Sequence, residues 1–159
     1  MIKVTLIALG KLKEKYLKDA VSEYSKRLGG YCSLDIIELE PERLSNSPSQ
    51  SEIEIALKKE QEKIEKKILQ NSTVFSLCVE GKKLSSESFA EKIKNAENYG
   101  KNITFIIGSS YGLCEDIKRK ADFRLSVSDM TFPHQLFRVM LLEQIYRGFK
   151  INEGSAYHK

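Results

Sequence analysis

A nearly unbroken apolar run at residues 103–107, Ile-Thr-Phe-Ile-Ile, limits the possible folds of this chain more than any other feature. Strands with such runs are buried on both faces, as in parallel sheets that helices cover on each side. Four further strand-like segments occur, and segments with helical spacing of apolar residues separate them. These four segments are residues 2–8, 34–39, 73–79 and 123–127. The alternation predicts an α/β fold, a three-layer sandwich with a mostly parallel sheet.

The predicted helices carry their own start and stop signals. Ser51 and Glu54 have the spacing of a capping box, which predicts a helix from about residue 52. Gly29 and Gly30 predict the end of the first helix. The five helices are expected at about residues 12–28, 52–69, 86–100, 114–120 and 134–148. With 159 residues and no clear internal repeat, we expect a single domain over residues 1–159.

The last predicted helix is apolar around most of its circumference. A helix that covers one face of a sheet needs only an apolar stripe, so this helix needs a second partner. A second copy of the chain would be such a partner, which predicts a homodimer. The alternative is burial under the chain's own loops. The apolar residues of this helix are Leu136, Phe137, Val139, Met140, Leu141, Leu142, Ile145, Tyr146 and Phe149.

The composition is that of an ordinary soluble globular protein, with 41% hydrophobic and 30% charged residues. No apolar run approaches the roughly 18 residues of a membrane span. Residues 1–10 resemble a strand more than a signal peptide, so we expect no membrane partner and a cytoplasmic location. The net charge of +4 fits an acidic partner such as RNA. Three widely spaced cysteines predict neither a disulfide framework nor a metal site.

Two loops that follow predicted strands have chemistry suited to a ligand. They are residues 108–112, Gly-Ser-Ser-Tyr-Gly, and residues 128–132, Ser-Asp-Met-Thr-Phe. Ligands of open α/β sheets bind beyond the carboxyl ends of the strands, and glycines let a backbone approach a ligand closely. The chain has neither a Gly-x-Gly-x-x-Gly pattern nor a Walker A sequence, which argues against a dinucleotide or ATP site. A tight strand-to-helix turn is the other interpretation of the glycines.

The stretches around these loops resemble one family of known proteins. The resemblance rests on residues 106–113, on residues 125–135 with their Thr-Phe-Pro-His-Gln sequence, and on the final Tyr157-His158-Lys159. Shorter matches add to it, at residues 10–13, Tyr24, Arg27, Leu28, Arg138, residues 142–144, Tyr146 and Arg147. On these residues the chain resembles the RlmH family over its whole length.

The resemblance implies a ribosomal RNA methyltransferase of the SPOUT class that acts as a dimer. It also implies a trefoil knot in the C-terminal part of the sheet, with S-adenosylmethionine bound in the knot as methyl donor. The implied substrate is a pseudouridine in a 23S rRNA hairpin, methylated at N3 during ribosome maturation. We therefore expect 23S rRNA as the partner, within the large subunit or the assembled ribosome.

By position, the resemblance implies which residues would bind the donor. Leu77 would face the adenine, and the backbone of the second loop would provide much of the holding. Ser109 stands where a second glycine is expected, and Tyr111 where a small polar residue is common. A loop that needed a positive φ at Ser109 would be strained. The implied donor-binding residues are Leu77, Gly108, Val127, Ser128, Asp129, Met130, Thr131 and Phe132.

Methylation of an imide nitrogen requires removal of its proton, because the nitrogen lone pair must attack the methyl group. Histidine titrates nearest neutral pH, and this chain has only two. His158 is the first candidate for the base, reaching the cofactor of a partner subunit. Tyr157 could stack on the target base, and Arg147 and Lys159 could contact phosphate or stabilise the anion. His134 could position RNA or the loop, or make a structural hydrogen bond near a helix N-terminus.

Three other interpretations stay open. A preorganised site needs no single general base. A non-catalytic RNA-binding α/β protein would use its lysines and Tyr157 as RNA contacts and would bind no cofactor. A small-molecule enzyme would bind a phosphate in the loop at residues 108–112 and would not need the C-terminal residues.

Overall fold

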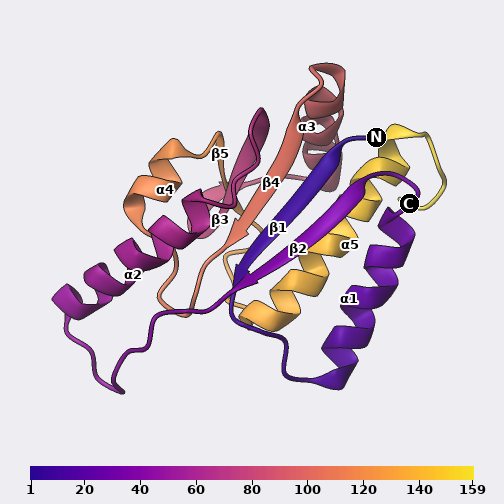
Figure 1. Ribbon diagram of the computed structural model, residues 1–159. Helices are drawn as coiled ribbons and strands as arrows, with labels where there is room; N and C mark the ends of the chain where they lie inside the picture. Colours follow the sequence, from indigo (N-terminus) through magenta and orange to yellow (C-terminus); the bar gives the residue numbers. More distant parts are fainter.

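In the computed structural model, residues 1–159 form one five-stranded sheet with helices on both faces (Figure 1). The strands are β1 (Lys3–Leu9), β2 (Ser33–Leu39), β3 (Ser72–Lys83), β4 (Asn102–Ile107) and β5 (Phe123–Ser126). Their order across the sheet is β2-β1-β4-β3-β5, and every pair of neighbours is parallel. The predicted α/β sandwich is confirmed, and its sheet is wholly parallel.

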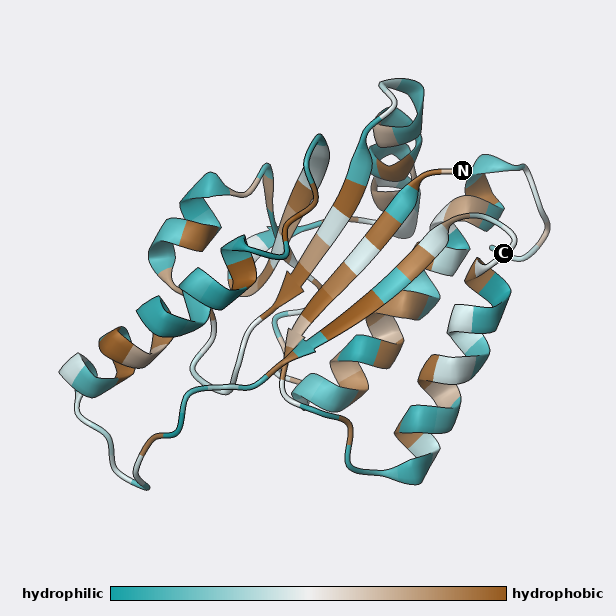
Figure 2. Ribbon diagram, viewed as in Figure 1, coloured by the Kyte–Doolittle hydropathy of each residue, from teal (hydrophilic) through white to brown (hydrophobic).

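Two hydrophobic clusters, one on each face of the sheet, hold the three layers together. Helices α1 (Lys15–Leu28), α3 (Ser86–Asn98) and α5 (His134–Asn152) cover one face, and α2 (Gln50–Glu65) and α4 (Glu115–Lys120) cover the other (Figure 1). A cluster of 18 buried residues joins the first three helices to the sheet, and a cluster of six joins the other two. Hydrophobic residues accordingly concentrate in the strands (Figure 2). Central strand β4, covered on both faces, explains the apolar run at residues 103–107.

Helix α5 lies between α1 and α3, which explains much of its apolar surface (Figure 1). Tyr31 stacks on Phe149 with ring centroids 5.5 Å apart. A Cβ on Gly148 would lie 2.7 Å from Ile93 Cδ1 of α3, so a larger residue would require the Ile93 side chain to move. Within one chain, the apolar circumference is therefore covered mainly by helices, with Leu136 still 39% exposed. None of the five helices combines the length and apolarity of a membrane span.

Two predicted helix starts were wrong for identifiable reasons. Helix α2 is capped by Ser49, two residues before the predicted cap Ser51. The Oγ of Ser49 accepts from the Glu52 amide at 3.1 Å. The same Ser-x-x-Glu spacing occurs at both places, and the helix begins at the one directly after Pro48. Helix α1 begins at Lys15 rather than residue 12. The amides of residues 12 and 13 instead donate to side chains of β2 and α5.

Strand β3, predicted over residues 73–79 with Gly81 as its stop, runs from Ser72 to Lys83. Its pairing with β5 shifts between Leu77 and Lys82, so the residues between them bulge out of the ladder. A Cβ on Gly81 would lie 2.7 Å from the backbone of Leu125, so glycine lets β3 pass close to β5 here. The bulge places residues 78–80 beside the loops at the carboxyl edge of the sheet.

Candidate functional site

A cavity of about 370 Å³ opens at the carboxyl ends of β3, β4 and β5. Its walls are the β3 bulge, the β4–α4 loop and the β5–α5 loop, with the start of α5 beside them. The volume lies within the range of ligand pockets, roughly 300–1,000 Å³, and most lining residues are hydrophobic. The cavity therefore lies where open α/β sheets bind ligands, and we call it the donor cavity after the ligand that the resemblance implies.

The structure brings together all of the implied donor-binding residues except Asp129. Leu77 is buried at its inner wall, whereas Met130 is 75% exposed. The Asp129 carboxylate instead forms an ion pair with Lys83 Nζ, away from the cavity lining. The implied residues that line the cavity are Leu77, Gly108, Val127, Ser128, Met130, Thr131 and Phe132.

The β4–α4 loop is tight because its two glycines meet. A Cβ on Gly108 would lie 2.3 Å from the Gly112 carbonyl oxygen, so no larger residue fits without moving the backbone. Gly112 has a φ of +84°, which glycine adopts without strain. Ser109 does not have a positive φ, since Asn71 is the only non-glycine residue that does. The strain expected at Ser109 is therefore absent.

A buried carboxylate that sequence reasoning missed holds this loop. Ser109 Oγ donates to Glu60 Oε1 at 2.9 Å, and the Glu42 amide donates to Glu60 Oε2 at 2.9 Å. Glu60 is only 4% exposed. Glu60 lies four residues after Ala56 and four before Ile64, which puts it on the buried face of α2. This spacing could have identified Glu60 in the sequence. Mixed Lys and Glu residues, as in α2, are typical of a solvated helix face, so Glu60 does not stand out in the sequence.

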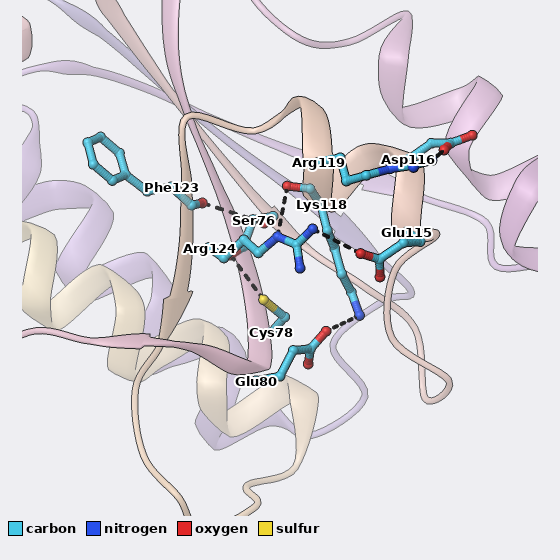
Figure 3. Close-up of polar contacts among 9 residues, drawn as sticks. All are labelled: Ser76, Cys78, Glu80, Glu115, Asp116, Lys118, Arg119, Phe123 and Arg124. Atoms are coloured by element: carbon cyan, nitrogen blue, oxygen red, sulfur yellow. Dashed lines mark hydrogen bonds and ion pairs between the residues drawn. The ribbon is translucent and has the colours of Figure 1, made fainter.

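An ion pair that sequence reasoning also missed lies in the cavity wall. Lys118 of α4 pairs through Nζ with the Glu80 carboxylate of the β3 bulge (Figure 3). Arg124 of β5 donates from Nε to the Lys118 carbonyl at 3.3 Å and from Nη2 to Glu115 at 2.9 Å. The hydrogen bond from Lys118 holds the pKa of Glu80 below its ordinary value. No local sequence pattern connects these residues, which lie 38 positions apart.

The C-terminal residues fold back on α5 and α3 in a side-chain network that we call the tail cluster. Arg147 pairs with Glu143 at 2.7 Å, and Tyr157 donates its hydroxyl to Glu143 at 3.2 Å. His158 contacts Arg147 Nη1 through Nδ1 at 3.2 Å and Glu87 through Nε2 at 2.7 Å. Three of the predicted catalytic residues, Arg147, Tyr157 and His158, are thus in mutual contact.

The two partners of His158 define its tautomer. Arginine can only donate, and a carboxylate can only accept. Nδ1 of His158 therefore accepts from Arg147, and Nε2 carries the proton and donates to Glu87. In this arrangement the single lone pair of the ring is already hydrogen-bonded. The imidazole must leave Arg147 before it can accept a proton from anything else.

Within one chain, the tail cluster does not line the donor cavity. His134 does line it, exposed at the rim, and desolvation by the surrounding groups lowers the pKa of His134, which favours the neutral ring. A second cavity, of about 410 Å³, shares the wall of residues 125–127 with the donor cavity and reaches Glu143 of the tail cluster. No group of three or more His, Cys, Asp or Glu side chains is arranged to hold a metal ion.

Known proteins resemble this chain over nearly all of its length. A family model described as a predicted SPOUT methyltransferase matches residues 2–158. The ribosomal RNA large subunit methyltransferase H of Clostridium beijerinckii is 52% identical over 157 residues, covering 98% of this chain and 99% of that protein. The protein of the same name from Acetivibrio thermocellus is 47% identical over 159 residues, covering 99% of this chain and all of its own length.

Solved structures share the fold at low sequence identity. A methylase family protein from Haemophilus influenzae Rd KW20 is 13% identical, with a TM-score of 0.54 over 99% of this chain and 70% of that one. The A. aeolicus TrmH/SpoU tRNA modifying enzyme is 8% identical, with a TM-score of 0.50 over 95% of this chain and 77% of that one. These likenesses concern the arrangement of sheet and helices.

Proposed function

The chain belongs to the SPOUT methyltransferase family, and on that premise we propose that it methylates N3 of a pseudouridine in 23S rRNA. One observation carries the proposal: about half of all positions are identical to ribosomal RNA large subunit methyltransferase H proteins, over almost the full length of both chains. The mildly basic net charge of +4 is compatible with an RNA substrate. Because that substrate is ribosomal, we also propose a cytoplasmic location.

We propose that S-adenosylmethionine binds in the donor cavity as methyl donor. The cavity fits such a ligand because most of its lining residues are hydrophobic, its volume suits a nucleoside, and two loops after strands line it. Leu77 would contact the adenine, and residues 127–132 would hold the rest mainly through their backbone. When bound, the cofactor supplies a methyl group on a sulfonium, which reacts by direct displacement.

The residues of the chain must then manage the proton of the imide nitrogen. We propose that His158 accepts it, with Tyr157 stacking on the target base and Arg147 stabilising the anion. In this tautomer the only lone pair of the ring, on Nδ1, accepts from Arg147. The C-terminal residues must therefore leave Arg147 before His158 can accept the proton. A tail that leaves its own helices could extend to the donor cavity of a second subunit. His134, at the rim, would position the loop or the RNA.

We propose that the protein acts as a homodimer. Large apolar side chains that remain exposed near the donor cavity support this, because one chain leaves them without cover. They are Val79 (66% exposed), Met130 (75%), Leu136 (39%) and Val127 (36%). They lie on the β3 bulge, the β5–α5 loop and the first turn of α5, so a second copy placed there would adjoin the cavity.

Two structural expectations remain part of the proposal. We propose that residues 1–159 form a single SPOUT domain, which agrees with one sheet carrying all five helices. We also propose the trefoil knot that the family resemblance implies. The crossing of the chain from β5, at one edge of the sheet, to α5, between α1 and α3, is compatible with it (Figure 1).

Methyl transfer from labelled S-adenosylmethionine to ribosomes that lack the modification tests this function. We expect label in 23S rRNA, located by mass spectrometry at N3 of a pseudouridine. The wild type is compared with a truncation that lacks residues 157–159, and donor binding is measured for both. Label only with the wild type, with binding intact in both, supports the role of the tail. Equal label from both would show that residues 157–159 are not needed for methyl transfer, and would still support the methyltransferase function.

Two further binding measurements, with RNA and with nucleotide phosphates, separate the alternative functions. RNA binding without donor binding would indicate a non-catalytic RNA-binding protein. Binding of nucleotide phosphates in the β4–α4 loop, without any effect of the truncation, would indicate a small-molecule enzyme.

A further inference from the structure

The wall of the donor cavity carries one positive and one negative side chain that face each other. Lys118 and Glu80 are the only Lys, Arg, Asp or Glu residues among its lining residues. They come from different elements, α4 and the β3 bulge, and point toward one another (Figure 3). The rest of the wall consists of apolar side chains, small polar residues and His134. Charge in this cavity is therefore concentrated at one place.

This pair is held in position by its neighbours. The Lys118 side chain is only 14% exposed, whereas that of Glu80 is 51% exposed. Arg124 donates to the Lys118 carbonyl and to Glu115, which fixes α4 against β5. Withdrawing an ammonium group from water is costly unless it is paired, and Glu80 is the only partner that it has in the structure. Lys118 thus keeps a charge close to the cavity at a cost to folding.

The proposed methyl donor offers a matching pair of charges. Its amino-acid end carries one carboxylate and one ammonium group, close together, whereas its adenosine is neutral. Resting on the proposed function, we propose that Lys118 binds the carboxylate of the donor and Glu80 its ammonium group. The four charges then alternate in sign, and each hydrogen bond has an ionised donor and acceptor, the strongest kind in proteins. The apolar part of the wall, including Leu77, remains for the adenosine.

A neighbouring ion pair provides the control. Arg119 and Asp116 pair on the same helix α4, with side chains 65% and 46% exposed, and neither lines the cavity. Arg119→Met removes one positive charge at the position next to Lys118. It therefore reproduces the change in net charge and in the helix without touching the cavity wall.

Binding of three ligands by calorimetry tests the assignment. S-adenosylhomocysteine has both charges of the amino-acid end, its decarboxylated analogue has only the ammonium group, and 5′-methylthioadenosine has neither. We expect the wild type and Arg119→Met to prefer S-adenosylhomocysteine over the decarboxylated analogue by about tenfold or more, the scale of a charge-assisted hydrogen bond. Lys118→Met should lose most of this preference while it binds 5′-methylthioadenosine as the wild type does.

Glu80→Gln tests the other half of the assignment. This variant should bind the decarboxylated analogue several-fold more weakly, relative to 5′-methylthioadenosine, than the wild type does, because it lacks the partner of the ammonium group. If Lys118→Met keeps the full preference of the wild type, the assignment is wrong although the donor site stands. If the wild type binds none of the three ligands, the proposed donor and this assignment both fail. Thermal unfolding of each variant shows whether a loss of affinity reflects a loss of folded protein.

Discussion

The donor cavity and the tail cluster are built in opposite ways. Residues from segments at the ends of three neighbouring parallel strands line most of the cavity, and most of its lining residues are hydrophobic. The tail cluster consists of five side chains whose charges and hydrogen bonds hold it together, and its members come from α3, α5 and the C-terminus. They are Glu87, Glu143, Arg147, Tyr157 and His158. Changes in the cavity should therefore alter donor binding, and changes in the cluster should alter methyl transfer.

His158→Ala should give the largest effect and the clearest separation of the two regions. General acid–base catalysis contributes about 100-fold to 10,000-fold to a rate, so methyl transfer should fall by that order. Donor affinity should stay within about twofold of the wild type, because His158 does not line the cavity. Single-turnover transfer to ribosomes and calorimetry of donor binding measure the two quantities. If the variant transfers methyl at the wild-type rate, His158 is not the general base, and a preorganised site without one becomes the better explanation.

Gly108→Ala should show the opposite pattern, with the loss in donor binding. Its Cβ would lie 2.3 Å from the Gly112 carbonyl oxygen, so the loop backbone must move. A displacement of about 1 Å at a binding site can cost about 100-fold, and we expect a loss of that order. Gly30→Ala is the matched control, since its Cβ would meet nothing closer than 4.0 Å. Equal donor affinity in both variants would contradict the role of this loop.

Ser109→Ala should have a smaller effect on the same loop. It removes the hydrogen bond to Glu60 and leaves a buried carboxylate with fewer partners, which costs about 1 kcal/mol, or about fivefold in donor affinity. Ser51→Ala changes an exposed serine of α2 that does not line the cavity, and should bind donor like the wild type. If the two variants bind donor equally well, Glu60 does not hold the loop in its binding conformation.

The smallest expected effect is on how the free energy of unfolding depends on pH, and it concerns His134, the histidine of the cavity. His134 is exposed at the cavity rim, but its surroundings partly desolvate the ring and disfavour the charged form, so its folded pKa lies below the ordinary 6.5. The unfolded state therefore binds more protons below that pH, and the free energy of unfolding falls as the pH drops from 7.5 to 5.5. His134→Gln should reduce this fall, as measured by urea unfolding at both pH values. An unchanged pH dependence would show that His134 is not desolvated.

Several sequence predictions succeeded because they depended on local patterns. The apolar residues 103–107 are a central buried strand, and the alternation of strands and helices gave the right layers. Helix starts failed where two signals competed, as with the serines at 49 and 51. The predicted end of β3 was wrong because glycine, which often ends a strand, here allows β3 to pass close to β5 at Gly81.

By itself, the sequence determined the α/β class and the family and located two loops that line the cavity, because periodicity and short motifs are local properties of the chain. Only the tertiary structure revealed Glu60 behind Ser109, the Lys118–Glu80 pair, and the engaged lone pair of His158. The first two join residues 49 and 38 positions apart that the folded sheet brings within hydrogen-bonding distance, and the third depends on the C-terminal residues folding back on α5. Such contacts follow from strand order and helix packing, which the pattern along a single chain does not specify.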